Sequence, residues 1–343
     1  MIAVKKEGVL LHKTELPFEN EGVLNPAAIK EGDNVHLFYR AVQEGNHSTI
    51  GYCKLKGPLE VELRNKLPLI LPEFDYESKG LEDPRIVKID DLFYLTYTAY
   101  DGVNALGALA TSTDLIHFEK RGIIVPKITY QNFARLLVLK ETTEKYLYYN
   151  EHERSIKSQG KQQFLWDKNL IFFPKRIGGR LCFLHRIKPD IQIIVSVEDL
   201  KDLNEVFWAD YFLHLDRYIV LSPKYDHEIS YIGGGCPPIE TSEGWLMIYH
   251  GVHDSSKGYV YSACAALLDL HNPQIEIARL PYPLFKPELV WELKGEVNNV
   301  CFPTGAVLFG DALYIYYGAA DERIATVSVS MSALLTELLL NKL

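Results

Sequence analysis

The stretch that decides the fold is NPAAIKEGDNVHLFYRA at residues 25–41, which reads as a proline, a short apolar strand, a polar turn and a second, aromatic strand. The same order recurs in DPRIVKIDDLFYLTYTA (83–99), FPKRIGGRLCFLHRI (173–187), PPIETSEGWLMIYHGV (237–252) and FPTGAVLFGDALYIYYGAAD (302–321). Two runs of β-branched and aromatic residues around a short polar turn are typical of a β-hairpin. The pattern therefore predicts five copies of one hairpin.

Each copy has a proline at the start of its first strand. These residues are Pro26, Pro84, Pro174, Pro238 and Pro303, which lie 58, 90, 64 and 65 residues apart. Proline suits the start of a strand because it cannot donate to the interior of a ladder. Four units are thus near 60 residues long, and the long step carries an insertion at about residues 127–166.

A second strand pair follows most copies, in TIGYCKL, LGALATSTDLIHFEK, IQIIVSVEDL, VYSACAALLDL and IATVSVSM. Four strands per unit are typical of a propeller blade. We therefore predict an all-β fold, a single domain over residues 1–343 that forms a five-bladed β-propeller with blades starting near residues 25, 83, 173, 237 and 302. Two stacked β-sandwiches are the rival architecture, but they do not explain five proline-anchored copies.

Helical periodicity is almost absent from the chain. The exception is SALLTELLLNKL at residues 332–343, which predicts a short C-terminal helix. In the insertion, the first part is compatible with a strand pair, and residues 151–163 are polar and loop-like. Long loops on a rigid scaffold are often functional, although disorder without function fits this composition equally well.

Composition narrows the classes of partner. The 343 residues include 36 Lys and Arg against 45 Asp and Glu, a net charge of −9, so a broad cationic surface for nucleic acid or anionic lipid is not expected. No stretch approaches the roughly 18 apolar residues of a membrane span, and the N-terminal residues lack a signal-peptide core. We expect a cytoplasmic protein without a nucleic-acid or membrane partner, and homo-oligomer formation stays open.

The cysteines indicate neither a disulfide framework nor a metal site. There are five, an odd number without a CxxC pair, and they are Cys53, Cys182, Cys236, Cys264 and Cys301. Widely spaced cysteines without partnered histidines do not match zinc-ligand spacing. We expect reduced, mostly buried thiols and no metal.

Polar residues at the strand ends identify a candidate site. In a propeller, equivalent positions of the blades meet around one axis, and those positions hold Asn25, Arg40, Asp83, His185, Arg186, His250 and Asp321. A purely structural repeat tends to place similar residues at equivalent positions, but these residues differ. The pattern predicts one site built from several units.

Asp83, in GLEDPRI, is the strongest catalytic candidate. An aspartate at this place can cap a turn, but the repeat directs it into the channel, where a raised pKa would let it act as a general acid. His185 and His250 lie on corresponding strands and, with Arg186 and Lys168, offer groups that would hold a dianion. The plainer alternatives are two core histidines and a solvated lysine.

These residues resemble glycoside hydrolase family 130, the β-mannoside phosphorylases and their hydrolytic relatives, whose fold is a five-bladed propeller. The likeness spans nearly the whole chain, in NPA with YRA, GLEDPRI with YLTYTAYDG, LATSTDLIHFEKRG, GGGCPPIETSEGWLMIYHGV, and VCFPTGAVL with IYYGAAD. It implies inverting phosphorolysis of a β-linked manno-oligosaccharide or mannosyl-glucose. Asp83 would give its proton through a mannose hydroxyl, and inorganic phosphate would attack the anomeric carbon to release α-mannose 1-phosphate.

The resemblance also implies roles for the other candidates. Phosphate would be bound by Lys168, His250, Tyr261 and Arg186. The sugar would be bound by Asn25, Arg40, His185 and Asp321. The implied partners are a β-mannoside and phosphate as co-substrate, without a cofactor. Phosphate as nucleophile needs only one protein carboxyl group, whereas water needs a second as base.

The chain departs from the family pattern in two places. Asn169 stands where the phosphorylases tend to carry an aspartate, and the insertion stands where they place a further phosphate-binding arginine, for which Arg154 is a candidate. The hydrolytic relatives replace phosphate ligands with glutamates, and Glu151, Glu153 and Glu228 are available here. An inverting β-mannosidase that uses water and a non-catalytic carbohydrate-binding propeller are therefore the alternatives.

Overall fold

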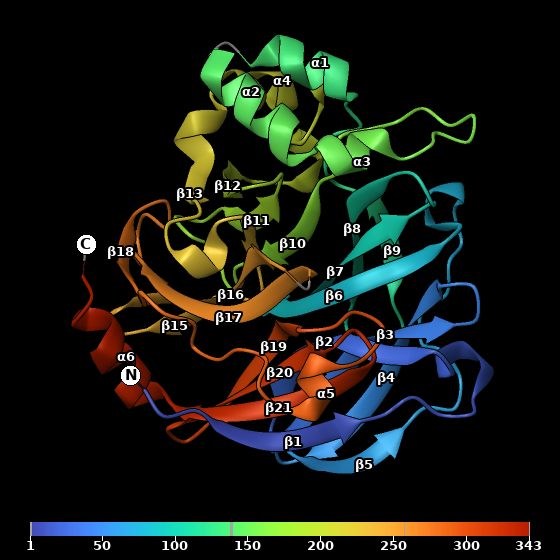
Figure 1. The fold of residues 1–343 in the computed structure, drawn as a ribbon, viewed down its shortest axis with the longest axis vertical. Coiled ribbons are helices and arrows are strands. Elements are labelled where there is room, and N and C mark those ends of the chain that lie inside the picture. Colours follow the sequence, from blue (N-terminus) through green and yellow to red (C-terminus); the bar gives the residue numbers. More distant parts are fainter. Residues whose placement is uncertain (1, 138–139, 257, 343) are drawn as a thin grey trace.

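The structure is a computed structural model that describes residues 2–137, 140–256 and 258–342. Antiparallel strands are the main regular element of these residues and helices are few, so the all-β prediction is confirmed. Strand pairing gives four sheets, and the largest consists of two antiparallel units joined by one parallel pair, Ser48 with Gly80. The strands therefore form five antiparallel units (Figure 1).

The units are numbered here in chain order. Unit 1 consists of β2 (Gly22–Glu31), β3 (Asn34–Gln43), β4 (His47–Lys56) and β5 (Glu60–Arg64). Unit 2 consists of β6 (Gly80–Ile89), β7 (Leu92–Tyr100), β8 (Ala105–Ser112) and β9 (Glu119–Ile123). Unit 3 consists of β10 (Lys168–Phe172), β11 (Leu181–Arg186), β12 (Ile191–Val197) and β13 (Ile219–Leu221).

The last two units complete the chain. Unit 4 consists of β14 (Tyr231–Gly234), β15 (Ile239–Thr241), β16 (Gly244–Ser255), β17 (Gly258–Leu268) and β18 (Glu276–Arg279). Unit 5 consists of β19 (Cys301–Phe309), β20 (Ala312–Ala319), β21 (Arg323–Ser330) and β1 (Lys5–Leu11), which pairs with β21 from the other end of the chain. Each of the five predicted second strand pairs contributes at least one strand to its unit.

A β-bulge marks the inner strand of units 1, 2 and 3. Register shifts follow Leu24, Glu82 and Lys168, and the next residues are Asn25, Asp83 and Asn169, with φ of 50°, 50° and 51°. Asparagine and aspartate tolerate this left-handed backbone better than other non-glycine residues, and a bulge re-aims a side chain. In unit 3 the alignment on Pro174 was therefore wrong, because the inner strand β10 precedes it.

Neighbouring units contact each other through their inner strands. β2 packs against β6, β6 against β10 and β10 against β14, while β19 packs against β16, β17 and β2. Thr304 Oγ1 of unit 5 donates to the Pro26 carbonyl of unit 1 at 2.9 Å, and Arg85 Nε of unit 2 donates to the Gly235 carbonyl at 2.5 Å. The ends of the five inner strands thus meet in one region.

The insertion is helical, so the predicted strand pair was wrong. It holds α1 (Tyr130–Leu136), α2 (Lys140–Tyr149) and α3 (Glu151–Ser155), and α4 (Glu205–Leu213) joins them at one end of the molecule (Figure 1). Thr129 caps α1 by accepting from the Asn132 N–H at 3.2 Å. Phe133 packs edge-on against Phe212, so the apolar faces of these helices share a core with units 2 and 3.

Two further α-helices lie elsewhere in the fold. The predicted C-terminal helix is confirmed as α6 (Met331–Leu339), which Ser330 caps and which buries Leu334 and Leu338. The other is α5 (Val290–Leu293). No helix among the described residues combines the length and apolar character that crossing a membrane requires.

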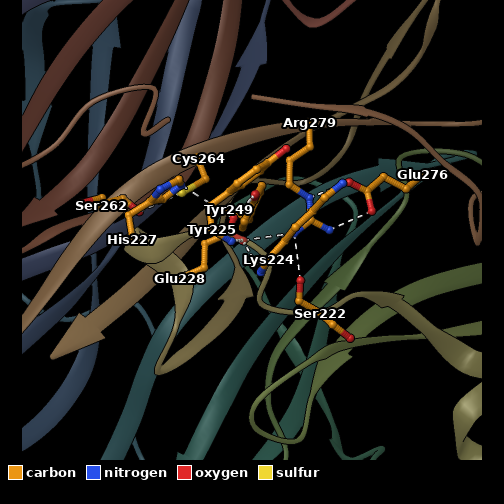
Figure 2. A network of polar contacts seen from close by, with 10 residues as sticks. All are labelled: Ser222, Lys224, Tyr225, His227, Glu228, Tyr249, Ser262, Cys264, Glu276 and Arg279. Atoms are coloured by element: carbon orange, nitrogen blue, oxygen red, sulfur yellow. Dashed lines mark hydrogen bonds and ion pairs between the residues drawn. The ribbon is translucent and has the colours of Figure 1, made fainter. Parts of the chain in front are cut away.

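Four units share a buried carboxylate that the sequence analysis did not identify. Each glutamate precedes the inner strand, is fully buried and accepts from a tyrosine hydroxyl of the next strand; the pairs are Glu19 with Tyr39, Glu77 with Tyr97, Glu228 with Tyr249 and Glu292 with Tyr317. A cation completes each group; these are Arg64, Lys120, Arg279 and Lys6. We call these four groups the glutamate locks, and Figure 2 shows the one in unit 4.

Candidate active site

A cavity of about 250 Å³ opens where the inner strands meet. It collects seven of the nine predicted site residues: Asn25, Arg40, Asp83, Lys168, Arg186, Tyr261 and Asp321. The insertion contributes Glu153 and Trp166 to its wall. A larger cavity of about 810 Å³ lies between α1 and α4 and contains none of the predicted residues.

Asp83 is placed by the bulge of unit 2 and held from unit 1. Asn25 Nδ2 donates to Asp83 Oδ1 at 2.7 Å, and an Arg40 guanidinium nitrogen lies 4.0 Å from the same oxygen. Burial alone would raise the pKa of Asp83, but the charges of Lys168, Arg40 and Arg85 outweigh it and hold the pKa below its ordinary value. The condition under which Asp83 would act as a general acid, a raised pKa, is therefore not met by these surroundings alone.

Glu82 organises the cations beside Asp83. Its Oε1 lies 2.9 Å from an Arg40 nitrogen and its Oε2 lies 3.4 Å from Lys168 Nζ. Lys168 Nζ also lies 5.4 Å from the centre of the Trp166 ring. Arg40 and Lys168 are thus already balanced by a carboxylate. The signal for Glu82 was present in the motif GLEDPRI, where it directly precedes Asp83.

Asp321 adds a further carboxyl group to this side of the pocket. It lies in the turn between β20 and β21 of unit 5, with φ of 51°. Burial, together with the nearby charges of Asp83 and Glu82, raises the pKa of Asp321 to about 6, against the opposing effect of Arg40. Near neutral pH, Asp321 thus exchanges a proton more readily than an ordinary aspartate.

Arg186 and Lys188 form the cationic wall of the cavity, next to Lys168, which is the cross-strand partner of Arg186. Both charged groups lie over the ring of Tyr231, the Arg186 guanidinium at 5.3 Å and Lys188 Nζ at 4.4 Å from its centre. The Tyr231 hydroxyl in turn lies 2.5 Å from the Tyr261 hydroxyl. Arg186 has no ion pair within the described part of the chain, and its Nε has no hydrogen-bond partner there. This wall can therefore receive an anion.

Lys188 and Tyr231 were missed by the sequence analysis. Lys188 stands two residues after Arg186, so the alternation of side chains along an extended segment was the available signal. Burial and the charge of Arg186 lower the pKa of Lys188 to about 8, against the opposing effect of Glu153. Lys188 therefore titrates close to neutral pH.

His250 lies behind this wall rather than on its surface. Its ring is fully buried, 4.3 Å from the Phe302 ring centre, and neither ring nitrogen has a hydrogen-bond partner among the described residues. A Cβ on Gly233 would lie 2.5 Å from the ring, so only glycine leaves room for the imidazole. Burial and the surrounding cations hold the pKa of His250 well below its ordinary value, so it is a neutral group.

His185 is not brought into the cavity. Arg186 pairs with Lys168 on the inner strand of unit 3, and His250 pairs with Gly233 on the inner strand of unit 4. His250 therefore corresponds to Arg186. The expected match of His250 with His185 was wrong by one residue. A shift of one residue turns a side chain to the other face of its strand. His185 Nδ1 lies 2.9 Å from the Asp167 carboxylate and Nε2 lies 2.8 Å from the Tyr211 hydroxyl, in a fully buried network.

The residues considered for the departures from the family pattern lie in different places, and only one of the charged ones lines the cavity. Glu153 is buried and lines the cavity, whereas Glu151 and Arg154 are exposed on the same helix. Arg154 donates to the Leu147 carbonyl at 3.4 Å and does not line the cavity. Glu228 belongs to the lock of unit 4. Of the three glutamates considered, only Glu153 is therefore in place to affect the chemistry.

One group among the described residues has the atoms and spacing to hold a metal ion. Ligand atoms of His227, Glu228 and Cys264 lie within 4.8 Å of one another (Figure 2). However, Glu228 already accepts from Tyr249, Arg279 and two backbone N–H groups, as its counterparts in other locks do. Burial also raises the pKa of the Cys264 thiol. The closeness of His227, Glu228 and Cys264 is therefore explained by the glutamate lock of unit 4 and does not require a metal ion.

Comparison with known proteins identifies the class of enzyme. Residues 7–338 match the family model of glycoside hydrolase family 130, described as beta-1,4-mannooligosaccharide phosphorylase. A 1,2-beta-oligomannan phosphorylase of Thermoanaerobacter sp. (strain X514) is 33% identical over 346 residues, 96% of this chain and 98% of the relative. A beta-1,2-mannobiose phosphorylase of the same organism is 33% identical and covers 92% of each chain. This chain belongs to glycoside hydrolase family 130.

Solved structures support the same fold. The beta-1,2-mannobiose phosphorylase of Listeria innocua, in complex with beta-1,2-mannobiose, superimposes with a TM-score of 0.70 at 22% identity and covers 94% of this chain and 93% of that one. A glycosyl hydrolase from Bacteroides ovatus gives a TM-score of 0.72 at 21% identity, with 96% and 94% covered. At this identity the likeness concerns the fold alone.

Proposed function

We propose that this chain catalyses inverting phosphorolysis of a β-linked manno-oligosaccharide or mannosyl-glucose and releases α-mannose 1-phosphate. The observation that carries the proposal is the division of the cavity wall into two parts. One part of the wall holds Asp83, fixed by Asn25, with Asp321 nearby and with Glu82 paired to Arg40 and Lys168. The other holds Arg186 and Lys188, with no carboxylate except Glu153. A phosphate nucleophile needs one acid, here Asp83, and a cationic cradle.

In this mechanism phosphate lies against Arg186, Lys188 and the Tyr261 hydroxyl, with Lys168 and the neutral His250 close behind. Asn25, Arg40 and Asp321 bind the mannose, and His185 positions Arg186 from the other face of β11. A phosphate oxygen forms a bond to the anomeric carbon as the glycosidic bond breaks on the opposite face. The leaving sugar takes the proton that Asp83 gives through a mannose hydroxyl. Hydrogen phosphate loses its own proton as it becomes the phosphate ester, and that proton returns to Asp83.

Phosphate binding also prepares Asp83. Lys168, Arg40 and Arg85 hold the pKa of Asp83 low, which favours the ionised form that cannot donate. A bound dianion offsets these positive charges and therefore raises the pKa of Asp83 toward the value a general acid needs. Acid catalysis would then depend on phosphate being in place.

We also propose that residues 1–343 form one domain, a five-bladed β-propeller in which β1 closes unit 5. The support is the series of contacts between consecutive units, which includes those of β19 with β16 and β17, together with the contact of β19 with β2. A cytoplasmic location is supported by five free, buried cysteine thiols, which suit a reducing compartment. Phosphate is the one co-substrate proposed, and no cofactor is required by this chemistry.

Product analysis tests the function. The purified chain is incubated with β-1,2- and β-1,4-linked mannosides, with and without phosphate, and the products are followed by NMR. We expect α-mannose 1-phosphate in the presence of phosphate and negligible sugar release in its absence. Equal turnover in phosphate-free buffer would exclude phosphorolysis.

Inverting hydrolysis is the second candidate, because Glu153 places a carboxylate in the same cavity as Asp83. In that reaction Glu153 would act as the base that activates water. Free mannose would form at a rate independent of phosphate, and Glu153→Gln would abolish its formation. A carbohydrate-binding protein without activity would instead bind mannosides equally well before and after Asp83→Asn, with negligible turnover in both forms.

A further inference from the structure

The charge of the proposed phosphate wall is reduced by a residue of the insertion. Glu153 of α3 is 2% exposed, and its Oε1 lies 2.5 Å from Lys188 Nζ. Its other carboxylate oxygen, Oε2, is buried and has no hydrogen-bond partner in residues 2–137, 140–256 and 258–342. Burying a charged oxygen without a partner is unfavourable. A buried carboxylate on the lysine of an anion site therefore needs a functional explanation.

The position of Glu153 does not depend on its charge. Asn150 Nδ2 donates to the Tyr146 carbonyl at 2.8 Å and to the Lys188 carbonyl at 3.0 Å, which ties α3 to the segment that carries Lys188. Gln163 Nε2 donates to the Glu153 carbonyl at 2.6 Å. Lys188 itself lies against the Tyr231 ring. A neutral side chain at position 153 would therefore leave Lys188 and α3 in place.

The remaining cations show why this carboxylate matters. Arg40 and Lys168 are balanced by Glu82, on the Asp83 side of the cavity. Arg186 and Lys188 are the other cations that line the cavity, and Glu153 is the carboxylate that the structure places on Lys188. A phosphate dianion bound here would take the place of this carboxylate on Lys188 or lie next to it. Like charges placed side by side in an interface cost several kcal/mol.

We propose that Glu153 is a specificity-determining residue that competes with phosphate for Lys188 and so weakens phosphate binding. This inference rests on the proposed phosphorolysis. The insertion thereby sets the phosphate concentration at which the enzyme works, because α3 supplies the competing charge. The same charge selects for nucleophiles that bind Lys188 more strongly than a carboxylate does, which favours the phosphate dianion over carboxylate anions.

The test is Glu153→Gln, which removes the charge and keeps the shape. We expect the KM for phosphate to fall about tenfold, while the KM for the neutral mannoside changes little. Sulfate, a dianion that cannot complete the reaction, should inhibit the variant at a correspondingly lower concentration. Glu151→Gln is the matched control, because Glu151 is exposed on the same helix and does not line the cavity.

The outcomes separate this inference from the proposed function. If the unaltered enzyme releases sugar equally without phosphate, the proposed function fails. If it depends on phosphate but Glu153→Gln leaves the phosphate KM and the sulfate inhibition unchanged, or weakens both, the competition fails. Isothermal calorimetry of phosphate binding gives a readout independent of turnover, and thermal melting verifies that the variant is folded.

Discussion

Unit 3 differs from the other four units in what holds its buried carboxylates. Units 1, 2, 4 and 5 each contain a glutamate lock built within the repeat and its edges. In unit 3 His185 stands where the others have the lock tyrosine, because Arg186 pairs with Lys168 as Arg40 pairs with Leu24. The carboxylate bound by His185 is Asp167.

The helices of unit 3 supply the remaining partners. Tyr211 of α4 contacts His185, and Lys145 and Tyr146 of α2 bind the buried carboxylate of Asp190 at 2.7 Å to 2.8 Å. In unit 3, side chains from the helices thus take the place of the glutamate lock that the other four units contain. Helix α3 also brings Glu153 into the cavity, and the segment between α3 and β10 brings Trp166. Unit 3 thus combines a distinct packing scheme with the cationic wall.

The largest effect is expected from removing the proposed proton donor, Asp83. Asp83→Asn removes the one proton donor proposed, so turnover of a β-mannoside with phosphate should fall about 10³-fold or more, with the thermal midpoint little changed. Steady-state kinetics measures the loss. A residual rate within tenfold of the unaltered enzyme would contradict the role of Asp83.

Breaking a glutamate lock should have the next largest effect, on stability. Glu77→Gln leaves Lys120, whose side chain is 6% exposed, with only the exposed carboxylate of Glu73 at 3.7 Å, so the free energy of unfolding should fall by about 3 kcal/mol. Urea denaturation measures it. Glu240→Gln is the control, because Glu240 pairs with Lys175 on the surface and its loss should cost less than about 1 kcal/mol. Equal losses in both variants would show that the buried ion pair of a glutamate lock contributes no more to stability than a surface ion pair.

The corresponding change in unit 3 should cost less. Asp190→Asn keeps an acceptor for the Tyr146 hydroxyl, and Lys145 is 36% exposed and can turn to water. We expect a loss of about 1–3 kcal/mol by the same denaturation measurement. A loss as large as that of Glu77→Gln would mean that the helices bind unit 3 as tightly as the locks bind the others.

The pH dependence of phosphate binding sharpens the assignment of the cationic wall. The pKa of Lys188 is lowered to about 8, so Lys188 loses its charge as the pH rises through that value. The KM for phosphate should therefore rise several-fold between about pH 7 and pH 9. Because Glu153 raises the pKa of Lys188, the rise should begin at lower pH in Glu153→Gln. A flat profile would remove Lys188 from the phosphate site.

The smallest effect on phosphate binding is expected from replacing Arg154, the candidate that the family resemblance suggested as a further phosphate-binding arginine. Arg154 is exposed and donates only to the Leu147 carbonyl among the described residues, so Arg154→Ala should change the phosphate KM by less than about twofold. Kinetics at varied phosphate measures the change. A tenfold increase would show that α3 turns Arg154 inward when the substrate binds.

The repeat and most of the site were predictable because both follow from local patterns. Proline, turn and alternating apolar residues located the hairpins, and the motif around Asp83 located the acid wall. Pro174 misled the alignment of unit 3, since the feature shared by Asn25, Asp83 and Asn169 is a left-handed bulge rather than a proline. The match of His250 with His185 was a separate error of one residue, because strand pairing places His250 level with Arg186.

Other features depend on contacts between distant segments. The pairing of β1 with β21 joins the two ends of the chain, and no local pattern encodes it. The helices of the insertion become stable through packing on units 2 and 3, which their weak periodicity does not reveal. The lowered pKa of Asp83 depends on Lys168 and Arg40, which lie far from the motif in sequence, as well as on Arg85 within it, so the motif alone could not fix the direction of the shift.

The central claim is that this pocket uses phosphate, rather than water, as its nucleophile. The most direct measurement follows β-1,2-mannobiose with the purified chain by NMR, in phosphate-free buffer and after phosphate is added. We predict that α-mannose 1-phosphate forms only after the addition, in step with the phosphate consumed. Free mannose released at the same rate before and after the addition would contradict the account.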